Sequence, residues 1–156
     1  MTWSLRLQGG DLVKGQGNSL KTITGPEKVQ QDLRLEILSN LGDDPLTPNY
    51  GSVIDFDSDV FVTLEEETLF VPEDRLDLIV EEIDRIIEGY QQRQYVRLQN
   101  ETIAFNGRHT FSSGEIITGY GIEYEQVLTT LYIDIRLDLL SEETTVVSLT
   151  VEGESV

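Results

Sequence analysis

Three aspartates at alternate positions, Asp55, Asp57 and Asp59, form a group of carboxylates that could bind a cation. With Glu66 eleven residues after Asp55, they place oxygen ligands at positions one, three, five and twelve of a calcium-loop pattern. The sixth position is Val60, where such a loop needs glycine because a β-branched side chain resists a positive φ. The pattern therefore argues against an EF-hand and leaves only incidental cation binding open. We expect no resident metal or cofactor.

The residues that could form a catalytic site are few in kind. His109 is the only histidine, and no G-x-S-x-G elbow accompanies it, so a serine-hydrolase arrangement has little support. Carboxylate pairs for glycoside hydrolysis will arise by chance among 29 acidic residues, and no pair is marked as buried. Gly15 and Gly17 lack the third glycine of a dinucleotide loop. We therefore expect a protein that is not an enzyme.

Charge and composition exclude further classes. Lys+Arg is 11 against 29 Asp+Glu, so no basic stripe exists for direct nucleic-acid binding. The absence of cysteine excludes disulfide scaffolds and thiolate metal sites. No run of about 18 apolar residues predicts membrane insertion. What remains is a globular domain with a strong acidic excess.

The formal net charge of -18 suggests a halophilic source. Such an excess destabilises a compact state by self-repulsion in dilute salt, and it is common in proteins that work in concentrated salt. We expect a higher melting temperature in about 3 M salt than in about 0.1 M salt, where screening is weaker. Thermal melts followed by circular dichroism measure this, and greater stability in the dilute buffer would contradict the hypothesis.

The first element with a clear period is a helix expected to begin at Pro26 and end at Gly42. Proline suits the first helical position because its missing N–H would be unpaired there. Apolar side chains recur about every four residues and form one stripe: Val29, Leu33, Ile37 and Leu41, with Leu38 beside them. Short strands are expected before this helix, at residues 3–7 and 20–24.

A second helix is expected from Pro72 to Tyr90, again with proline at its start. Apolar side chains at helical spacing form its stripe: Leu76, Ile79, Val80, Ile83, Ile87 and Tyr90. Its other face is acidic and reads as solvated. Between the two helices, residues 42–58 are irregular and residues 60–64 predict a short strand.

From Tyr95 onward the period of the apolar pattern changes to two, which is typical of strands. Asn106 and Gly107 predict a tight hairpin turn because both tolerate a positive φ. A long alternating run follows at residues 127–140, then a turn and a terminal strand at residues 145–151. The sequence therefore predicts a single α+β domain over residues 1–156, with two main helices packed on one face of a mostly antiparallel sheet that the C-terminal strands extend.

Two stretches, GPEKVQQDLR at residues 25–34 and LTPNYGS at residues 46–52, give the chain a family resemblance. It resembles the baseplate wedge and sheath-initiator family of contractile phage tails and contractile injection systems, also labelled lysozyme-like. Members typically have an amphipathic helix, a Pro-Asp-Phe-Gly-Ser-like turn, a second helix, a Glu-Pro-Arg-like motif and paired terminal strands. Here Pro48, Tyr50 and Gly51 stand in the turn, and the resemblance makes them candidates for partner contacts. The resemblance covers residues 22–156.

This resemblance implies a structural role in the baseplate of a virion tail or of a cell-derived injection particle, assembled in the host cytoplasm. Six copies would surround the tail tube, each held by baseplate wedge proteins, and would template the first ring of the tail sheath protein. A terminal strand with unpaired main-chain groups can do this by β-augmentation. Val146, Leu149 and Val151 are the candidates for that edge. We expect deletion of residues 145–156 to block sheath growth and leave the domain folded.

The Glu-Pro-Arg-like motif has only a partial counterpart, Gln91, Gln92 and Arg93. By resemblance, Arg93 would anchor a partner carboxylate or carbonyl groups; a plain surface arginine is the alternative. The terminal strand could equally be the last strand of a closed sheet. At the level of function, the alternatives are a baseplate-associated cell-wall glycoside hydrolase, a structural protein of a non-contractile tail, and an unrelated acidic binding module.

Overall fold

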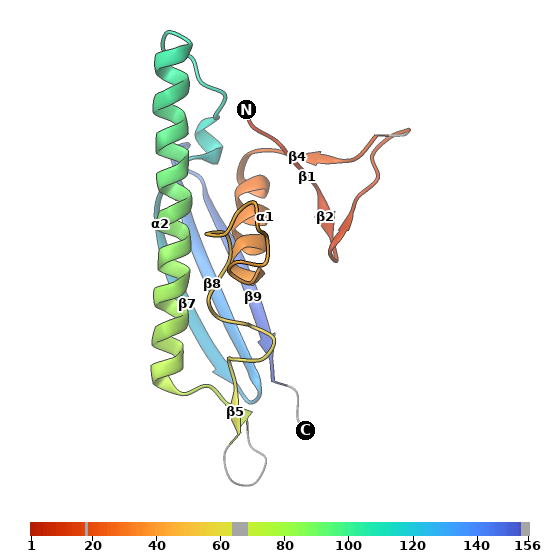
Figure 1. Cartoon of the computed structure of the whole chain (residues 1–156), viewed down its shortest axis with the longest axis vertical. Helices are drawn as coiled ribbons and strands as arrows, with labels where there is room; N and C mark the ends of the chain where they lie inside the picture. Colours follow the sequence, from red (N-terminus) through yellow and green to blue (C-terminus); the bar gives the residue numbers. More distant parts are fainter. Residues whose placement is uncertain (18, 64–68, 154–156) are drawn as a thin grey trace.

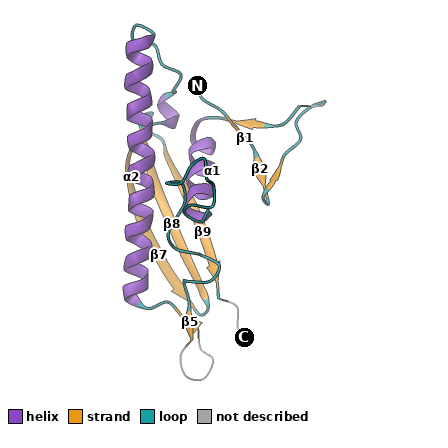
Figure 2. Ribbon diagram, viewed as in Figure 1, coloured by secondary structure: helices purple, strands orange, loops and turns teal. Residues whose placement is uncertain are grey.

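The computed structural model describes residues 1–17, 19–63 and 69–153. Two helices and a three-stranded antiparallel sheet form the body of the protein, so the predicted α+β class is confirmed (Figure 1). Figure 2 shows the same elements coloured by type. The main elements are α1 (Gly25–Leu38), α2 (Glu73–Ala104), β7 (Ile117–Val127), β8 (Thr130–Leu139) and β9 (Thr144–Glu152).

The sheet has the order β7-β8-β9, and one of its faces is buried. Along β8, alternate side chains point into the core while those between them are exposed. The inward residues of β8 are Leu131, Ile133, Ile135, Leu137 and Leu139. On β9 the same alternation buries Val147, Leu149 and Val151. Because side chains alternate in a strand, this register fixes which face meets the helices.

Both helices contribute to the core that this sheet face closes. Val29, Leu33 and Ile37 of α1 are fully buried, and so are four isoleucines of α2, at positions 79, 83, 86 and 87. Burying an aliphatic side chain of this size contributes roughly 1.5–3 kcal/mol. The stripes predicted from the sequence are therefore the faces that hold the helices to the sheet, except that Leu38 and Leu41 lie on the surface.

Short strands complete the chain. β1 (Ser4–Leu5) pairs with β4 (Thr22–Ile23), and β2 (Leu7–Gln8) pairs with β3 (Asp11–Leu12). These four strands form an arm beside α1 (Figure 1). Between the helices, β5 (Val62–Thr63) pairs with β6 (Leu69–Phe70). Leu64, the expected end of the strand at residues 60–64, lies outside the described residues.

The largest difference from the sequence prediction is the length of α2. It runs 32 residues to Ala104, so the expected strand from Tyr95 and the hairpin at Asn106-Gly107 are wrong. Asn106 and Gly107 do adopt positive φ, 53° and 88°, but they close the helix: the Gly107 N–H donates to Thr102 O at 2.8 Å. That is the bonding of a Schellman C-cap. Residues that tolerate positive φ serve helix ends as well as hairpins.

A second difference concerns the run at residues 127–140. The chain turns at Leu128 and Thr129, with Leu128 at φ 55°, and joins β7 to β8 as a hairpin. No glycine, proline or asparagine marks this turn, so the pattern could not reveal it. The first helix also ends earlier than expected, at Leu38 and not at Gly42. The terminal strand lies where it was predicted.

Candidate partner-binding surfaces

One edge of β9 is unpaired within the described residues, because β8 borders only its other side. The Leu139 N–H donates to Glu143 O at 3.0 Å, and the Gly153 N–H donates to Thr129 O at 2.7 Å, in the register that joins β8 to β9. Bonded and non-bonded pairs alternate along an antiparallel ladder. Odd-numbered residues of β9 therefore bond to β8, and even-numbered residues turn their N–H and C=O outward. The outward residues are Thr144, Val146, Ser148, Thr150 and Glu152.

The three edge residues named from the sequence are separated by this parity. Val146 is half-exposed, and its main-chain groups point outward. Leu149 and Val151 are buried in the core, and their main-chain groups point toward β8. A strand added to this edge would therefore form main-chain hydrogen bonds with Val146 but not with Leu149 or Val151. That Val146 binds a partner stays a prediction.

Gln30 of α1 reaches this edge. Its Nε2 donates to Val146 O at 3.0 Å and also contacts Thr145 Oγ1. The bond independently places the Val146 carbonyl on the outward side of β9. It also means that α1 occupies one acceptor that an added strand would use.

The turn at residues 48–52 is fastened to both helices. The Ser52 N–H donates to Ser39 O at 2.7 Å, just after α1, and Arg85 Nη2 of α2 donates to Gly51 O at 2.8 Å. Gly51 is buried, whereas Pro48 is exposed. Gly51 therefore acts on the fold of the turn, and Pro48 is the part of the motif that lies on the surface.

Tyr50 lies half-buried beside this turn. Burial, followed by the nearby negative charges of Glu36 and Asp32, raises the pKa of Tyr50 to about 12. Its hydroxyl therefore stays neutral at physiological pH.

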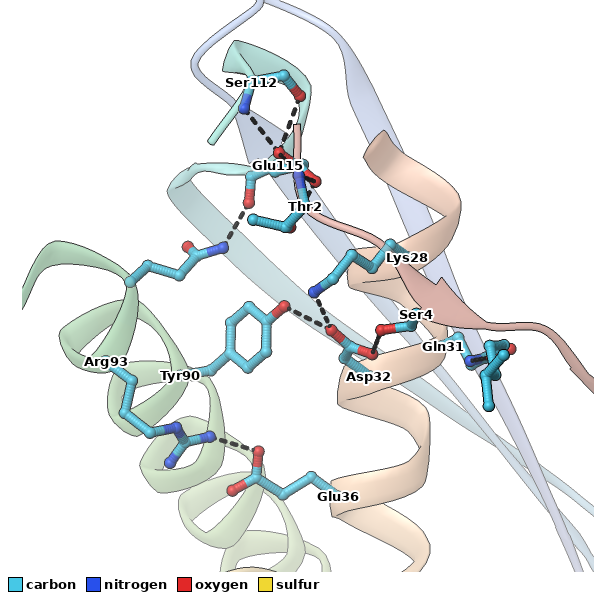
Figure 3. Close-up of polar contacts among 12 residues, drawn as sticks. Thr2, Ser4, Lys28, Gln31, Asp32, Glu36, Tyr90, Arg93, Ser112 and Glu115 are labelled. Carbon is cyan, nitrogen blue, oxygen red and sulfur yellow. Dashed lines mark hydrogen bonds and ion pairs between the residues drawn. The ribbon is translucent and has the colours of Figure 1, made fainter. Parts of the chain in front are cut away.

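Arg93 is engaged inside its own chain. Its Nη2 lies 2.6 Å from Glu36 Oε2, which joins α2 to α1 (Figure 3). Glu36 is only 3% exposed, and burial raises its pKa although the Arg93 charge acts to lower it. The guanidinium also lies 5.8 Å from the centre of the Tyr90 ring, and about half of the Arg93 side chain is exposed to solvent. Within the chain Arg93 therefore pairs with Glu36, and that it also contacts a partner stays a prediction.

Asp32 ties the N-terminal arm to both helices. It accepts hydrogen bonds from the Ser4 hydroxyl at 3.2 Å and the Tyr90 hydroxyl at 3.1 Å, and it pairs with Lys28 (Figure 3). Burial and the negative charge of Asp32 raise the pKa of Tyr90. On the same helix face, Gln31 bonds to the backbone of the arm through Leu7 N and Leu5 O.

Glu115 holds the N-terminus against the sheet. Its carboxylate accepts the Thr2 N–H at 2.9 Å, the Thr2 hydroxyl at 2.6 Å and the Ser112 N–H at 2.6 Å (Figure 3). Burial acts to raise the pKa of Glu115, but the hydrogen bonds from Ser112 and Thr2 outweigh it and the pKa is lowered. A charged carboxylate with this many donors is stabilised in place.

The sequence reasoning missed four residues that organise polar contacts: Gln30, Glu36, Glu82 and Glu115. Glu82 is 7% exposed, accepts the Val53 N–H at 2.9 Å and pairs with Arg85 at 2.7 Å. Two of the four could have been found from the sequence. Glu36 falls beside Leu33 and Ile37 on the buried stripe of α1, and Glu82 falls beside Ile79 and Ile83 on the buried stripe of α2. A carboxylate on an apolar stripe indicates a buried, partnered charge. Gln30 carried no such signal.

The residues considered for chemistry do not converge. Within the described ranges no three His, Cys, Asp or Glu side chains gather to hold a metal ion, and Glu66 of the calcium-loop pattern lies outside those ranges. His109 is exposed and lies on the loop after α2. None of the helices described is long and apolar enough to cross a membrane.

Comparisons with protein-family models, with curated proteins and with solved structures gave no match to this chain.

Proposed function

We propose that this protein is a structural component of a tail baseplate that joins wedge proteins around the tail tube and templates the first sheath ring by β-augmentation. The particle is a virion tail or a cell-derived injection particle, and six copies surround the tube. The sequence resemblance over residues 22–156 supports the family, and the edge of β9 supplies the physical means.

The observation that carries this proposal is the row of outward main-chain groups on β9. From Thr144 to Glu152, five even-numbered residues turn N–H and C=O away from β8, and Gln30 occupies one of these carbonyls. Unpaired strand edges attract further strands because main-chain hydrogen bonds supply affinity without a particular side-chain sequence. The buried side chains of the same strand keep this edge rigid, as a template requires.

Deleting the terminal strand is not a clean test, contrary to the expectation from the sequence. Val147, Leu149 and Val151 belong to the core, and the odd-numbered residues carry the bonds to β8. Removal of residues 145–156 would open the hydrophobic core and unfold the domain. A test must change the outward groups alone.

Ser148→Pro is the change that meets this requirement. Ser148 turns its N–H outward, so proline removes a donor to an added strand and no bond to β8. We expect baseplates that carry Ser148→Pro to assemble but to initiate few or no sheaths. Electron microscopy of assembly reactions with purified sheath protein, counting sheathed particles, measures this.

Ser148→Ala is the matched control. Both changes remove the 2.7 Å bond from the Ser148 hydroxyl to Asp134, but alanine keeps the N–H. Sheath growth on Ser148→Pro baseplates equal to that on Ser148→Ala baseplates would overturn the proposal. If circular dichroism shows that Ser148→Pro unfolds, Thr150→Pro, at the next outward position, replaces it. Muralytic activity of the purified protein, abolished by a single Glu→Gln change, would favour the hydrolase alternative instead.

A further inference from the structure

A groove of about 720 Å³ runs beside the outward edge of β9. One wall is β9 at residues 146–148, the floor is α1, and the N-terminal arm forms the other side through Arg6 and Gly10. A strand added to β9 would lie in this groove. Half of its side chains would then point toward α1, because side chains alternate across a strand.

The spacing along α1 matches the spacing along such a strand. Gln30, Arg34 and Leu38 follow one another at intervals of four and all line the groove. Four helical residues advance about 6 Å, and two strand residues advance about 6.6 Å. Helix α1 and strand β9 run side by side in the same direction (Figure 1). Gln30 lies beside Val146. At this spacing Arg34 therefore lies beside Ser148, and Leu38 lies beside Thr150.

The chemistry of the groove differs from that of the rest of the protein. In a chain of net charge -18, Arg34 and Arg6 both line it, and neither forms an ion pair with any described residue. Leu38 and Leu35 also line it, and they are 46% and 37% exposed to solvent. Glu27 is the one acidic residue among those that line it. A positively charged side chain, Arg34, is therefore followed by an apolar one, Leu38, along the unpaired edge of β9.

We infer that this groove binds an extended partner segment that carries an acidic side chain opposite Arg34 and an apolar side chain opposite Leu38, two residues away. This inference rests on the proposed β-augmentation at β9 and adds the chemistry that selects the partner. A second copy of this chain fits less well. Its β9 offers a single acidic residue, Glu152, at its end, and two chains of net charge -18 repel.

Gln30 sets where the segment begins to pair. An added strand must displace its side chain from Val146 O before that carbonyl can accept a main-chain N–H. Gln30 thus competes with an added strand for the carbonyl of Val146, and it forms no hydrogen bond with the main chain of Ser148 or Thr150.

Two fluorescein-labelled peptides test the inference on the full-length protein by fluorescence anisotropy. Both have nine residues, the length of β9, and alternate threonine with valine. One carries glutamate and the other lysine in place of its central valine. We expect the glutamate peptide to bind about fivefold more tightly than the lysine peptide. The net charge of the protein, -18, would by itself favour the lysine peptide, so this preference would have to come from the groove. Arg34→Glu should reverse this preference, and Gln30→Ala should tighten both peptides about threefold.

Arg108→Glu is the matched control, because Arg108 is exposed on the loop after α2 and the change in net charge is the same. It should keep the preference for glutamate. Equal affinities for the two peptides, or a preference that Arg34→Glu leaves unchanged, would overturn the inference while strand addition itself stands. Binding of neither peptide, binding that survives Ser148→Pro, or self-association in place of peptide binding would overturn it as well. Sheath counts on Ser148→Pro baseplates judge the proposed function separately.

Discussion

Replacing Gly51 with alanine is expected to destabilise the protein by about 3 kcal/mol or more. Gly51 has φ +108°, a region that side chains with a Cβ rarely adopt, and an added Cβ would lie 2.7 Å from Ser39 O and 2.8 Å from Asn40 C. These are backbone atoms, which cannot rotate away as a side chain can. The clash would separate the Asn40–Ser52 bridge and pull the turn from the end of α1. Urea unfolding followed by circular dichroism measures the loss.

Gly42→Ala is the control for this effect. Gly42 has φ +84° but no atom within 4 Å of an added Cβ, so only the backbone strain of about 1 kcal/mol applies. The difference between the two variants isolates the close approach of residues 39–40. Equal losses in the free energy of unfolding for the two variants would show that the turn shifts to accommodate a Cβ at residue 51, and that packing does not require glycine there.

This turn illustrates how far the sequence could be interpreted. Its residues were recognised through the family resemblance and assigned to partner contacts. The structure buries Gly51 and bonds its carbonyl to Arg85, a contact between positions 34 residues apart. No local pattern specifies such a contact, because it depends on where α2 crosses the end of α1. The sequence marked these residues as a turn, and the tertiary packing shows what Gly51 contacts within the chain.

The helices and the terminal strands were predictable because their buried faces repeat regularly. The failure at residues 95–107 has a physical reason. The last turns of α2 project past the sheet (Figure 1), so they lack a buried stripe, and Val96 and Ile103 are exposed. Without that stripe, periodicity cannot distinguish helix from strand. The one buried polar residue there, Gln94, bonds to the backbone of Glu115 and Ile117.

Arg93→Ala is expected to destabilise the protein by about 2 kcal/mol at about pH 8, and by less at about pH 4. The change leaves Glu36, 3% exposed, without its cation. The pKa of Glu36 is already raised by burial, and the loss of Arg93 raises it further. Below that pKa Glu36 is protonated in both proteins and the difference shrinks, whereas above it the variant carries an uncompensated buried charge. Urea unfolding at both pH values measures the two losses.

Arg97→Ala is the matched control on the same helix. Arg97 pairs with Glu101 at 3.1 Å, and the hydrogen bonds of Glu101 with Thr110 and Arg97 lower its pKa. The benefit of that pair is also lost as pH falls, but only at a lower pH than for Glu36, so the loss in Arg97→Ala should change less between about pH 8 and about pH 4 than the loss in Arg93→Ala. An equally large change between the two pH values in both variants would contradict the assignment of Glu36 as the buried partner.

The Arg93–Glu36 pair also decides how a partner role for Arg93 can be measured. A loss of wedge binding in Arg93→Ala alone would not separate contact from folding, because the same change leaves a buried charge. The double variant Glu36→Gln with Arg93→Gln removes both charges, so the buried-charge penalty disappears. If wedge proteins still fail to bind this variant at native stability, the exposed half of the guanidinium contacts the partner. If binding returns with stability, Arg93 acts only by holding α1 against α2.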